Sequence, residues 1–194
     1  MADSSRPDFW DQRYRDGVTP WDFGRVPADL RAYLQQLMPG ARVLVPGCGS
    51  AHEVYCLAEN GFDVVAVDFS ATAVEVARRT LGCFAELVHM ADFFDFDAGR
   101  RPFDVIYERA FLCALPRKLW PHYGPRCAQL LPPGGHLAGF YFYGAEPKGP
   151  PFGTSAEELH GLLDSFFEQL EDRPAVESLA VFGGGERWQV WRRR

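Results

Sequence analysis

Short apolar segments alternate with amphipathic segments along most of the chain, and this alternation limits the possible folds more than any other feature. Runs rich in β-branched and aromatic residues predict strands at 42–45, 63–67, 86–90, 103–107, 136–143 and 187–192. Apolar residues at helical spacing predict helices at 27–38, 51–60, 71–81, 121–131 and from 154 to about 167. Strands and helices in this order form βαβ units with right-handed crossovers. We therefore expect an α/β fold with a doubly wound, mostly parallel sheet.

Capping residues support several of these boundaries. Ser70 is a candidate N-cap for the helix at 71–81, and Ser155 begins a segment that resembles a capping box. Asn60-Gly61 ends the helix before the second strand with a residue that accepts a left-handed conformation. Doubly wound sheets bind ligands outside the carboxyl ends of their strands. We therefore expect the functional residues to follow the strands, after Val45, Val67, Met90 and Tyr107.

The composition is that of a folded protein with a sizeable core. The chain has 194 residues, of which 47% are hydrophobic, and we expect a single domain over 1–194. The net charge of −6 argues against nucleic-acid binding, and the basic run at 192–194 is interpreted as a solvated chain end. No signal peptide is evident, and no apolar run approaches the roughly 20 residues of a membrane span. We expect a soluble, cytoplasmic protein.

Cysteine and histidine residues give no sign of a disulfide framework or a metal site. The five cysteines are an odd number without a C-x-x-C pair, and we interpret them as reduced, mostly buried thiols. The five histidines do not lie at the spacing of zinc ligands. We therefore expect no bound metal.

The first strand runs directly into the turn Pro-Gly-Cys-Gly-Ser, which contains Gly47 and Gly49. Glycine permits a positive φ and lets the backbone approach a ligand closely. Asp68 follows Gly47 at about the 20-residue spacing at which an acidic residue binds ribose hydroxyls in nucleoside-binding α/β folds. His52 stands where a dinucleotide motif has its third glycine, which favours a nucleoside cofactor without a pyrophosphate. The alternative is a tight turn that binds nothing.

The third strand is also followed by polar and aromatic residues. Asp92 could accept a hydrogen bond from an adenine amino group, and Phe93 or Phe94 could cover the ring. Asp104 begins the fourth strand, and the segment LLPPGG at 130–135 leads into the fifth. Together with the glycine turn, these strand ends strengthen the prediction of a nucleoside site.

These segments, in this order, resemble class I S-adenosylmethionine-dependent methyltransferases. Nearly the whole chain is similar to the thiopurine S-methyltransferase family and its halide/thiocyanate (thiol) methyltransferase branch. The likeness rests on FWDQRYRDGVTPWDFGR at 9–25, VLVPGCG at 43–49, YERAFLCAL at 107–115 and GPPF at 149–152. It implies a Rossmann-like methyltransferase fold, with a seven-stranded sheet and an antiparallel last strand. Residues 1–26 would form an N-terminal lid segment and 27–194 the core.

The resemblance also implies which residues bind S-adenosylmethionine. Aromatic residues of the lid segment would flank the cofactor, the glycine turn would lie against its amino-acid portion, and the acidic strand ends would bind its ribose and adenine. The implied residues are Trp10, Tyr14, Trp21, Gly47, Gly49, Asp68, Asp92, Phe93 and Arg109.

Three positions distinguish the branches or depart from the wider class. Tyr14 stands where the thiol branch often has tryptophan, and the PGCG turn is closer to that branch. Arg109 stands where the thiopurine branch has an arginine beside the cofactor. Pro46 replaces the acid that often holds the methionyl ammonium, and backbone carbonyls near Gly47 or Ala110 are candidates to receive it. The substrate class therefore stays open between the branches.

The implied reaction requires alignment and exclusion of water rather than a general base, because a sulfonium methyl is already activated. We assign no catalytic residue. The segment at 9–25 would act as a lid with aromatic faces near the sulfonium, or Trp10 and Tyr14 could simply pack a helix on the sheet edge. Phe23, Tyr141 and Phe152 could line an apolar substrate pocket, or belong to the core.

The leading hypothesis is an enzyme that methylates a small soft nucleophile: a thiol, a thiopurine, thiocyanate or a halide. The second is a non-catalytic nucleoside-binding or regulatory module on the same fold, since fold does not dictate function. The missing third glycine disfavours a nicotinamide-dependent oxidoreductase. We expect a small-molecule substrate, no nucleic-acid or membrane partner, and a monomer or weak homodimer.

Overall fold

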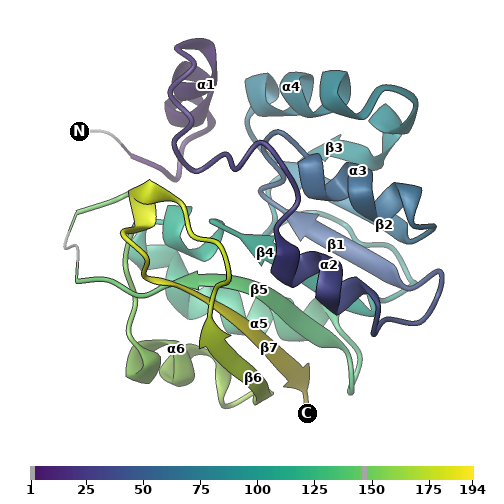
Figure 1. Cartoon of the computed structure of the whole chain (residues 1–194), viewed down its shortest axis with the longest axis vertical. Helices are drawn as coiled ribbons and strands as arrows, with labels where there is room; N and C mark the ends of the chain where they lie inside the picture. The colour runs from purple at the N-terminus through teal and green to yellow at the C-terminus, as the bar shows by residue number, and fades with distance from the viewer. Residues whose placement is uncertain (1–2, 146–147) are drawn as a thin grey trace. The chain divides into compact units, whose positions relative to one another are not determined.

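The computed structural model describes residues 3–145 and 148–194. The chain forms two compact units, one ending at Asp97 and the other beginning at Ala98. Its seven strands have the order β3-β2-β1-β4-β5-β7-β6, and Figure 1 labels them with the helices that flank them. Parallel pairing predominates, and the last strand pairs antiparallel with both of its neighbours. The expected fold class is confirmed.

The first unit is a three-stranded parallel arrangement with its connecting helices. Its elements are α1 (Pro7–Arg15), α2 (Ala28–Leu34), β1 (Arg42–Pro46), α3 (His52–Glu59), β2 (Asp63–Asp68), α4 (Ala71–Leu81), the 3-10 helix η1 (Gly82–Leu87) and β3 (Val88–Met90). Pro46 is opposite Val67 in the β1–β2 register, and Asp68 is opposite Met90 in the β2–β3 register. The three strands therefore end at one edge, where the residues that follow them can meet.

Helix α4 shows how local sequence builds this unit. Ser70 is its N-cap, as predicted, and the Ser70 hydroxyl accepts a hydrogen bond of 3.0 Å from the backbone N–H of Ala73. The apolar face of the helix is buried and consists of Ala73, Val74, Ala77 and Leu81. Helix α1 lies beside α4 (Figure 1). The N-terminal segment thus packs next to the helix that follows the second strand.

The second unit combines parallel and antiparallel pairing. Its elements are β4 (Val105–Arg109), the 3-10 helices η2 (Leu112–Ala114) and η3 (Arg117–Leu119), α5 (Trp120–Leu130), β5 (His136–Phe142), α6 (Ala156–Leu163), β6 (Phe167–Pro174), the 3-10 helix η4 (Ala180–Phe182) and β7 (Glu186–Arg193). Strand β5 is almost wholly buried, and so are Trp188 and Trp191 on β7; the Trp188 ring contacts Phe140 on β5 and the Trp191 ring contacts His160 on α6. These rings supply much of the apolar core of this unit.

Strand β6 was not predicted from the sequence. The helix expected to reach about residue 167 ends at Leu163, and Phe167 begins β6 instead. Buried or half-buried residues alternate with exposed ones along this strand, and two of the exposed residues, Glu168 and Asp172, are charged. Charged side chains are common on edge strands because they discourage pairing with other chains. The burial of the segment alternates as in a strand, but its many polar residues made the sequence pattern difficult to recognise.

Two strand boundaries also differ from expectation. The third strand begins at Val88 rather than at residue 86, because the residues before it form the 3-10 helix η1. The fourth strand spans Val105–Arg109 rather than 103–107. Phe103 lies outside it, and its backbone N–H donates to the carbonyl of Leu130. Arg109 is therefore the last residue of a strand rather than part of the following loop.

Two helical glycines of the second unit provide a matched test of its packing. A Cβ at Gly124 in α5 would lie 2.2 Å from the backbone oxygen of Leu162 in α6, whereas a Cβ at Gly161 in α6 meets nothing within 4 Å. Gly124→Ala should lower the free energy of unfolding by about 1–3 kcal/mol, because α5 and α6 must separate. Gly161→Ala should raise it by about 0.5–1 kcal/mol, because alanine restricts the unfolded chain. Urea denaturation measures both, and equal effects of the two substitutions would contradict the packing.

Candidate active site

The turn after β1 needs glycine for its backbone conformation. Gly47 and Gly49 have φ values of 58° and 52°, and the next helix begins after Ala51, whose φ is 61°. Glycine adopts this left-handed region at little cost, which most residues do not. The backbone N–H of Cys48 donates to the carbonyl of Val67 at 3.2 Å and so ties the turn to β2. The turn is held in a shape that exposes little side-chain bulk.

The side chain of Tyr14 lies close to this turn at Gly49. A Cβ at Gly49 would lie 2.6 Å from the hydroxyl oxygen of Tyr14. The sequence predicts such an approach by a ligand, and here the hydroxyl of Tyr14 makes it. Burial raises the pKa of Tyr14, so this hydroxyl is neutral at physiological pH. Gly49 thus leaves room for Tyr14.

Asp68 joins the ends of β1 and β2 through its carboxylate. It is the last residue of β2 and is 8% exposed. Its Oδ2 accepts from the backbone N–H of Gly49 at 3.1 Å, and its Oδ1 accepts from that of Ser70 at 2.9 Å. Burial raises the pKa of Asp68 to about 6, although these N–H groups oppose the shift. A carboxylate has about four acceptor positions, so the bonds from the backbone N–H groups of Gly49, Ser70 and Phe69 leave capacity for a further hydrogen bond.

The aromatic residues expected in the lid form one cluster. The ring centroids of Trp10 and Trp21 are 5.3 Å apart and those of Tyr14 and Trp21 are 6.1 Å apart, both in edge-to-face geometry. The guanidinium of Arg13 lies over the Phe9 ring at 4.7 Å. Such contacts stabilise a segment beyond simple area burial. The structure therefore brings the three predicted aromatics together, with Tyr14 on the glycine turn.

Asp92 and Phe93 lie in the turn after β3. The Asp92 carboxylate accepts from the backbone N–H of Phe94 at 2.9 Å and so stabilises its own turn. Phe93 is only 3% exposed, whereas Phe94, whose ring is 5.2 Å away, is half-buried. Of the two rings named for the adenine, Phe94 has the more accessible one.

Arg109 belongs to the second unit and is buried beside an acid. Its side chain is 5% exposed and its guanidinium is 3.5 Å from the carboxylate of Glu186, at the start of β7. The same guanidinium lies 4.8 Å from the centroid of the Phe140 ring. This ion pair joins the end of β4 to the start of β7.

Glu108 has a different role, next to Arg109 in the chain. It is 1% exposed, and its carboxylate accepts from the backbone N–H of Phe111 at 3.0 Å. This hydrogen bond holds the loop after β4, in which Ala110 has a φ of 56°. Burial raises the pKa of Glu108 to about 8, so the group is largely protonated at neutral pH.

The three residues proposed for a substrate pocket have different surroundings. Tyr141 is buried, and its hydroxyl oxygen is 3.4 Å from that of Tyr123 on α5, which places it in the core of the second unit. Phe152 is half-buried, and its backbone N–H donates to the carbonyl of Cys113 at 2.7 Å. Phe23, in the first unit, is half-buried with the guanidinium of Arg25 over its ring at 4.4 Å. Core packing therefore accounts for Tyr141.

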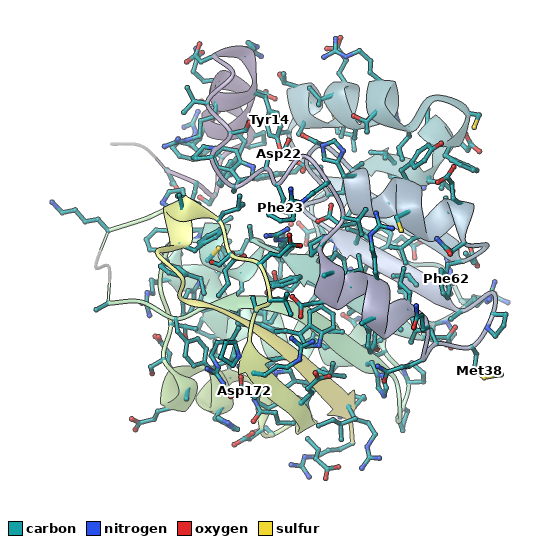
Figure 2. The ribbon with its side chains drawn as sticks, in the orientation of Figure 1. Tyr14, Asp22, Phe23, Met38, Phe62 and Asp172 are labelled. Atoms are coloured by element: carbon teal, nitrogen blue, oxygen red, sulfur yellow. The ribbon has the colours of Figure 1, made fainter. Side chains whose placement is uncertain are left out.

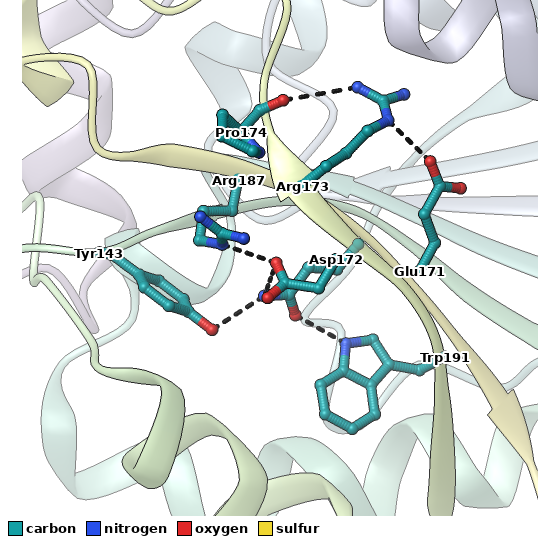
Figure 3. A network of polar contacts seen from close by, with 8 residues as sticks. Tyr143, Glu171, Asp172, Arg173, Pro174, Arg187 and Trp191 are labelled. Atoms are coloured by element: carbon teal, nitrogen blue, oxygen red, sulfur yellow. Dashed lines mark hydrogen bonds and ion pairs between the residues drawn. The ribbon is translucent and has the colours of Figure 1, made fainter.

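A polar network fixes the tyrosine that follows β5 (Figure 3). The side-chain amide of Gln189 donates to the hydroxyl of Tyr143 at 2.9 Å and to the carboxylate of Asp172 at 3.0 Å. Arg187 donates to the same carboxylate at 2.6 Å, and the indole of Trp191 donates to the Gln189 carbonyl. Sequence reasoning missed this network because Asp172 lies on the unplaced strand β6.

Cysteine and metal chemistry find no support in the described parts of the chain. All five cysteines are free, and burial raises the pKa of the Cys48 thiol beside the glycine turn, which keeps it unreactive. No group of three metal-ligating side chains occurs among residues 3–145 and 148–194. Within the same residues, no helix has the length and hydrophobicity that crossing a bilayer requires.

Comparison with known proteins places the chain in a family. It matches the thiopurine S-methyltransferase family over residues 5–194. It is 33% identical over 161 residues to probable thiol methyltransferase 2 of Arabidopsis thaliana, covering 79% of this chain and 70% of that protein. It is 31% identical over 171 residues to a thiopurine S-methyltransferase of Legionella pneumophila, covering 78% and 77%.

A solved structure shows the same fold at lower sequence identity. Magnesium protoporphyrin IX methyltransferase from Synechocystis, with bound S-adenosylhomocysteine, superposes with a TM-score of 0.74 at 15% identity over 97% of both chains. The family match over nearly the whole sequence, together with relatives of this similarity, shows that the chain belongs to the thiopurine S-methyltransferase family.

Proposed function

We propose that this protein transfers the methyl group of S-adenosylmethionine to a small soft nucleophile: a thiol, a thiopurine, thiocyanate or a halide. The observation that carries the proposal is the buried Asp68 carboxylate at the tip of β2, bonded to the glycine turn, in a chain of this family. The relatives named above are a thiol and a thiopurine methyltransferase. Their names favour catalysis over the non-catalytic nucleoside-binding module.

The residues of the first unit fit a nucleoside. Asp68 has acceptor capacity that suits a ribose hydroxyl, while Gly49 and Ser70 hold its carboxylate in place. The positive-φ turn lets backbone, rather than side chains, face the amino-acid portion of the cofactor. We propose Asp92 and the adjacent phenylalanine rings for the adenine. These assignments extend the family resemblance to particular atoms of this chain.

The cofactor supplies a sulfonium methyl, which is activated without help from a base. The protein's tasks are then to orient the nucleophile and to exclude water from it. In this proposal the cluster of Trp10, Tyr14 and Trp21 covers the site and offers aromatic faces to positive charge. We propose that Arg109 lies beside the cofactor, as the family resemblance implies, while it pairs with Glu186.

Other features of the proposal concern the whole protein. We propose that the segment before Pro27 is the lid of a single catalytic domain. The acidic net charge of −6 supports a protein that acts on small molecules rather than on nucleic acids. We further propose a cytoplasmic monomer or weak homodimer.

Removal of the Asp68 charge should weaken cofactor binding. Asp68→Asn keeps the size of the side chain but loses one carboxylate acceptor, so the affinity for S-adenosylhomocysteine should fall by at least about 1 kcal/mol. Isothermal titration calorimetry measures this, with Asp63→Asn at the opposite end of β2 as the matched control. Unchanged affinity in Asp68→Asn would remove this residue from the site.

The affinity should also depend on pH through Asp68. In the free protein the pKa of Asp68 is about 6, and ribose hydroxyls that donate to the carboxylate favour its charged form. Binding is therefore strongest above pH 6, and affinity should fall by up to about tenfold per pH unit below it, because a proton must first be released. Calorimetric titrations between about pH 5 and pH 8 should show this fall in affinity for the wild type. The affinity of Asp68→Asn should depend less on pH.

Catalysis is tested with a panel of nucleophiles. The protein with S-adenosylmethionine should yield methylated product from at least one of the small thiols, hydrosulfide, iodide, thiocyanate and thiopurines, measured by mass spectrometry or gas chromatography. NADH should neither bind nor stabilise the fold. Tight binding of S-adenosylhomocysteine without product from any member of the panel would instead favour the non-catalytic module.

A further inference from the structure

Two acidic side chains of the N-terminal segment, Asp11 on α1 and Asp22 on the stretch between α1 and α2, each directly follow a tryptophan of the aromatic cluster. Figure 2 shows Asp22 on this stretch between Tyr14 and Phe23. Neither acid belongs to the residues assigned to the cofactor or substrate, and each makes short hydrogen bonds to a helix start elsewhere in the first unit.

Asp11 binds the start of α4. Its Oδ1 accepts from the hydroxyl of Ser70 at 2.6 Å and from the backbone N–H of Thr72 at 2.9 Å. Burial opposes the charge, but these hydrogen bonds outweigh it and hold the pKa of Asp11 below its usual range. A carboxylate at a helix N-terminus is also favoured by the helix dipole. The backbone N–H of Ser70 also donates to Asp68. Asp11 is therefore bonded to the segment that positions the acid proposed for the ribose.

Asp22 binds the start of α3 in a similar way. Its Oδ2 accepts from the hydroxyl of Ser50 at 2.5 Å, and its Oδ1 lies 3.5 Å from Nε2 of His52. The backbone N–H of Gly24 donates to Oδ1 at 2.8 Å, which orients the carboxylate from its own segment. Ser50 directly follows Gly49, the residue that meets the hydroxyl of Tyr14. Asp22 therefore binds the residue that ends the glycine turn, as Asp11 binds the residues that follow β2.

We infer that Asp11 and Asp22 are positioning residues that clasp the N-terminal segment onto the tips of β2 and β1, and thereby control how fast the cofactor enters and leaves. The inference rests on the proposed cofactor site. With both clasps formed, Tyr14 lies against Gly49 and covers the turn. Exchange of a nucleoside bound at Asp68 then requires both clasps to release. Neither acid touches the reacting atoms, so both act through the position of the segment.

Limited proteolysis without ligand tests the clasps directly. Trypsin cleaves after arginines, and Arg13 and Arg15 lie in α1, so cleavage there requires the segment to detach. Asp11→Ala and Asp22→Ala should each be cleaved about tenfold faster, the change expected for loss of a hydrogen bond to a charged group. Asp8→Ala is the matched control, because Asp8 is on the same helix and its ion pair is with exposed Arg6. Cleavage of both clasp variants at the rate of Asp8→Ala would overturn the inference.

A second measurement links the clasps to exchange. The dissociation rate of S-adenosylhomocysteine, followed by stopped-flow tryptophan fluorescence, should rise about tenfold in Asp11→Ala and Asp22→Ala. Ser50→Ala should also raise the dissociation rate, and the double variant Asp22→Ala/Ser50→Ala should be no faster than Asp22→Ala, because Asp22→Ala already removes the contact with Ser50. Faster proteolysis with unchanged dissociation would also overturn the role in exchange.

A conservative variant separates clasping from general stability. Asp11→Asn keeps the one oxygen that accepts from Ser70 and Thr72, so this variant should lie close to the wild type in proteolysis. If the alanine variants fail to fold, as judged by circular dichroism, Ser50→Ala still tests the contact between Asp22 and the glycine turn. If Asp68→Asn leaves the affinity unchanged, the proposed function fails, whereas proteolysis without ligand continues to report on the clasps alone.

Discussion

One buried carboxylate, that of Asp68, organises the edge of the first unit where the strands end. It accepts a backbone N–H from the turn after β1 and another from the residue that caps α4, so it joins two strand tips and a helix start. A buried charge is costly unless it is hydrogen-bonded, and here both bonds come from rigid backbone. The remaining acceptor capacity, together with a pKa of about 6, makes this group responsive to a ligand that donates hydrogen bonds.

The N-terminal segment depends on the same edge. Its aromatic rings pack on one another, but two of its acids bond to Ser50, which follows Gly49, and to Ser70, whose N–H binds Asp68. A segment held by a few hydrogen bonds can release without disturbing the core beneath it. In the second unit, by contrast, the buried charges of Arg109 and Glu186 compensate each other as an ion pair.

Sequence reasoning succeeded where local rules apply. The glycine turn, the Ser70 cap and the acid at the end of β2 follow from spacing within a βαβ unit, and the structure confirms their placement. Asp11 was missed because its partners lie 59 and 61 residues away, where no spacing rule operates. Strand β6 was missed because charged residues on an edge strand mask its alternation, although Asp172 on it is held by β7 (Figure 3).

The most direct test of this account is a crystal structure of the protein with S-adenosylhomocysteine. The account predicts that the ribose hydroxyls donate to the carboxylate of Asp68, that the amino-acid portion lies along the turn at Gly47 to Gly49, and that Trp10 and Trp21 remain in one cluster over the ligand. A nucleoside bound away from the tips of β1 and β2, with the Asp68 carboxylate contacting only Gly49 and Ser70, would contradict it.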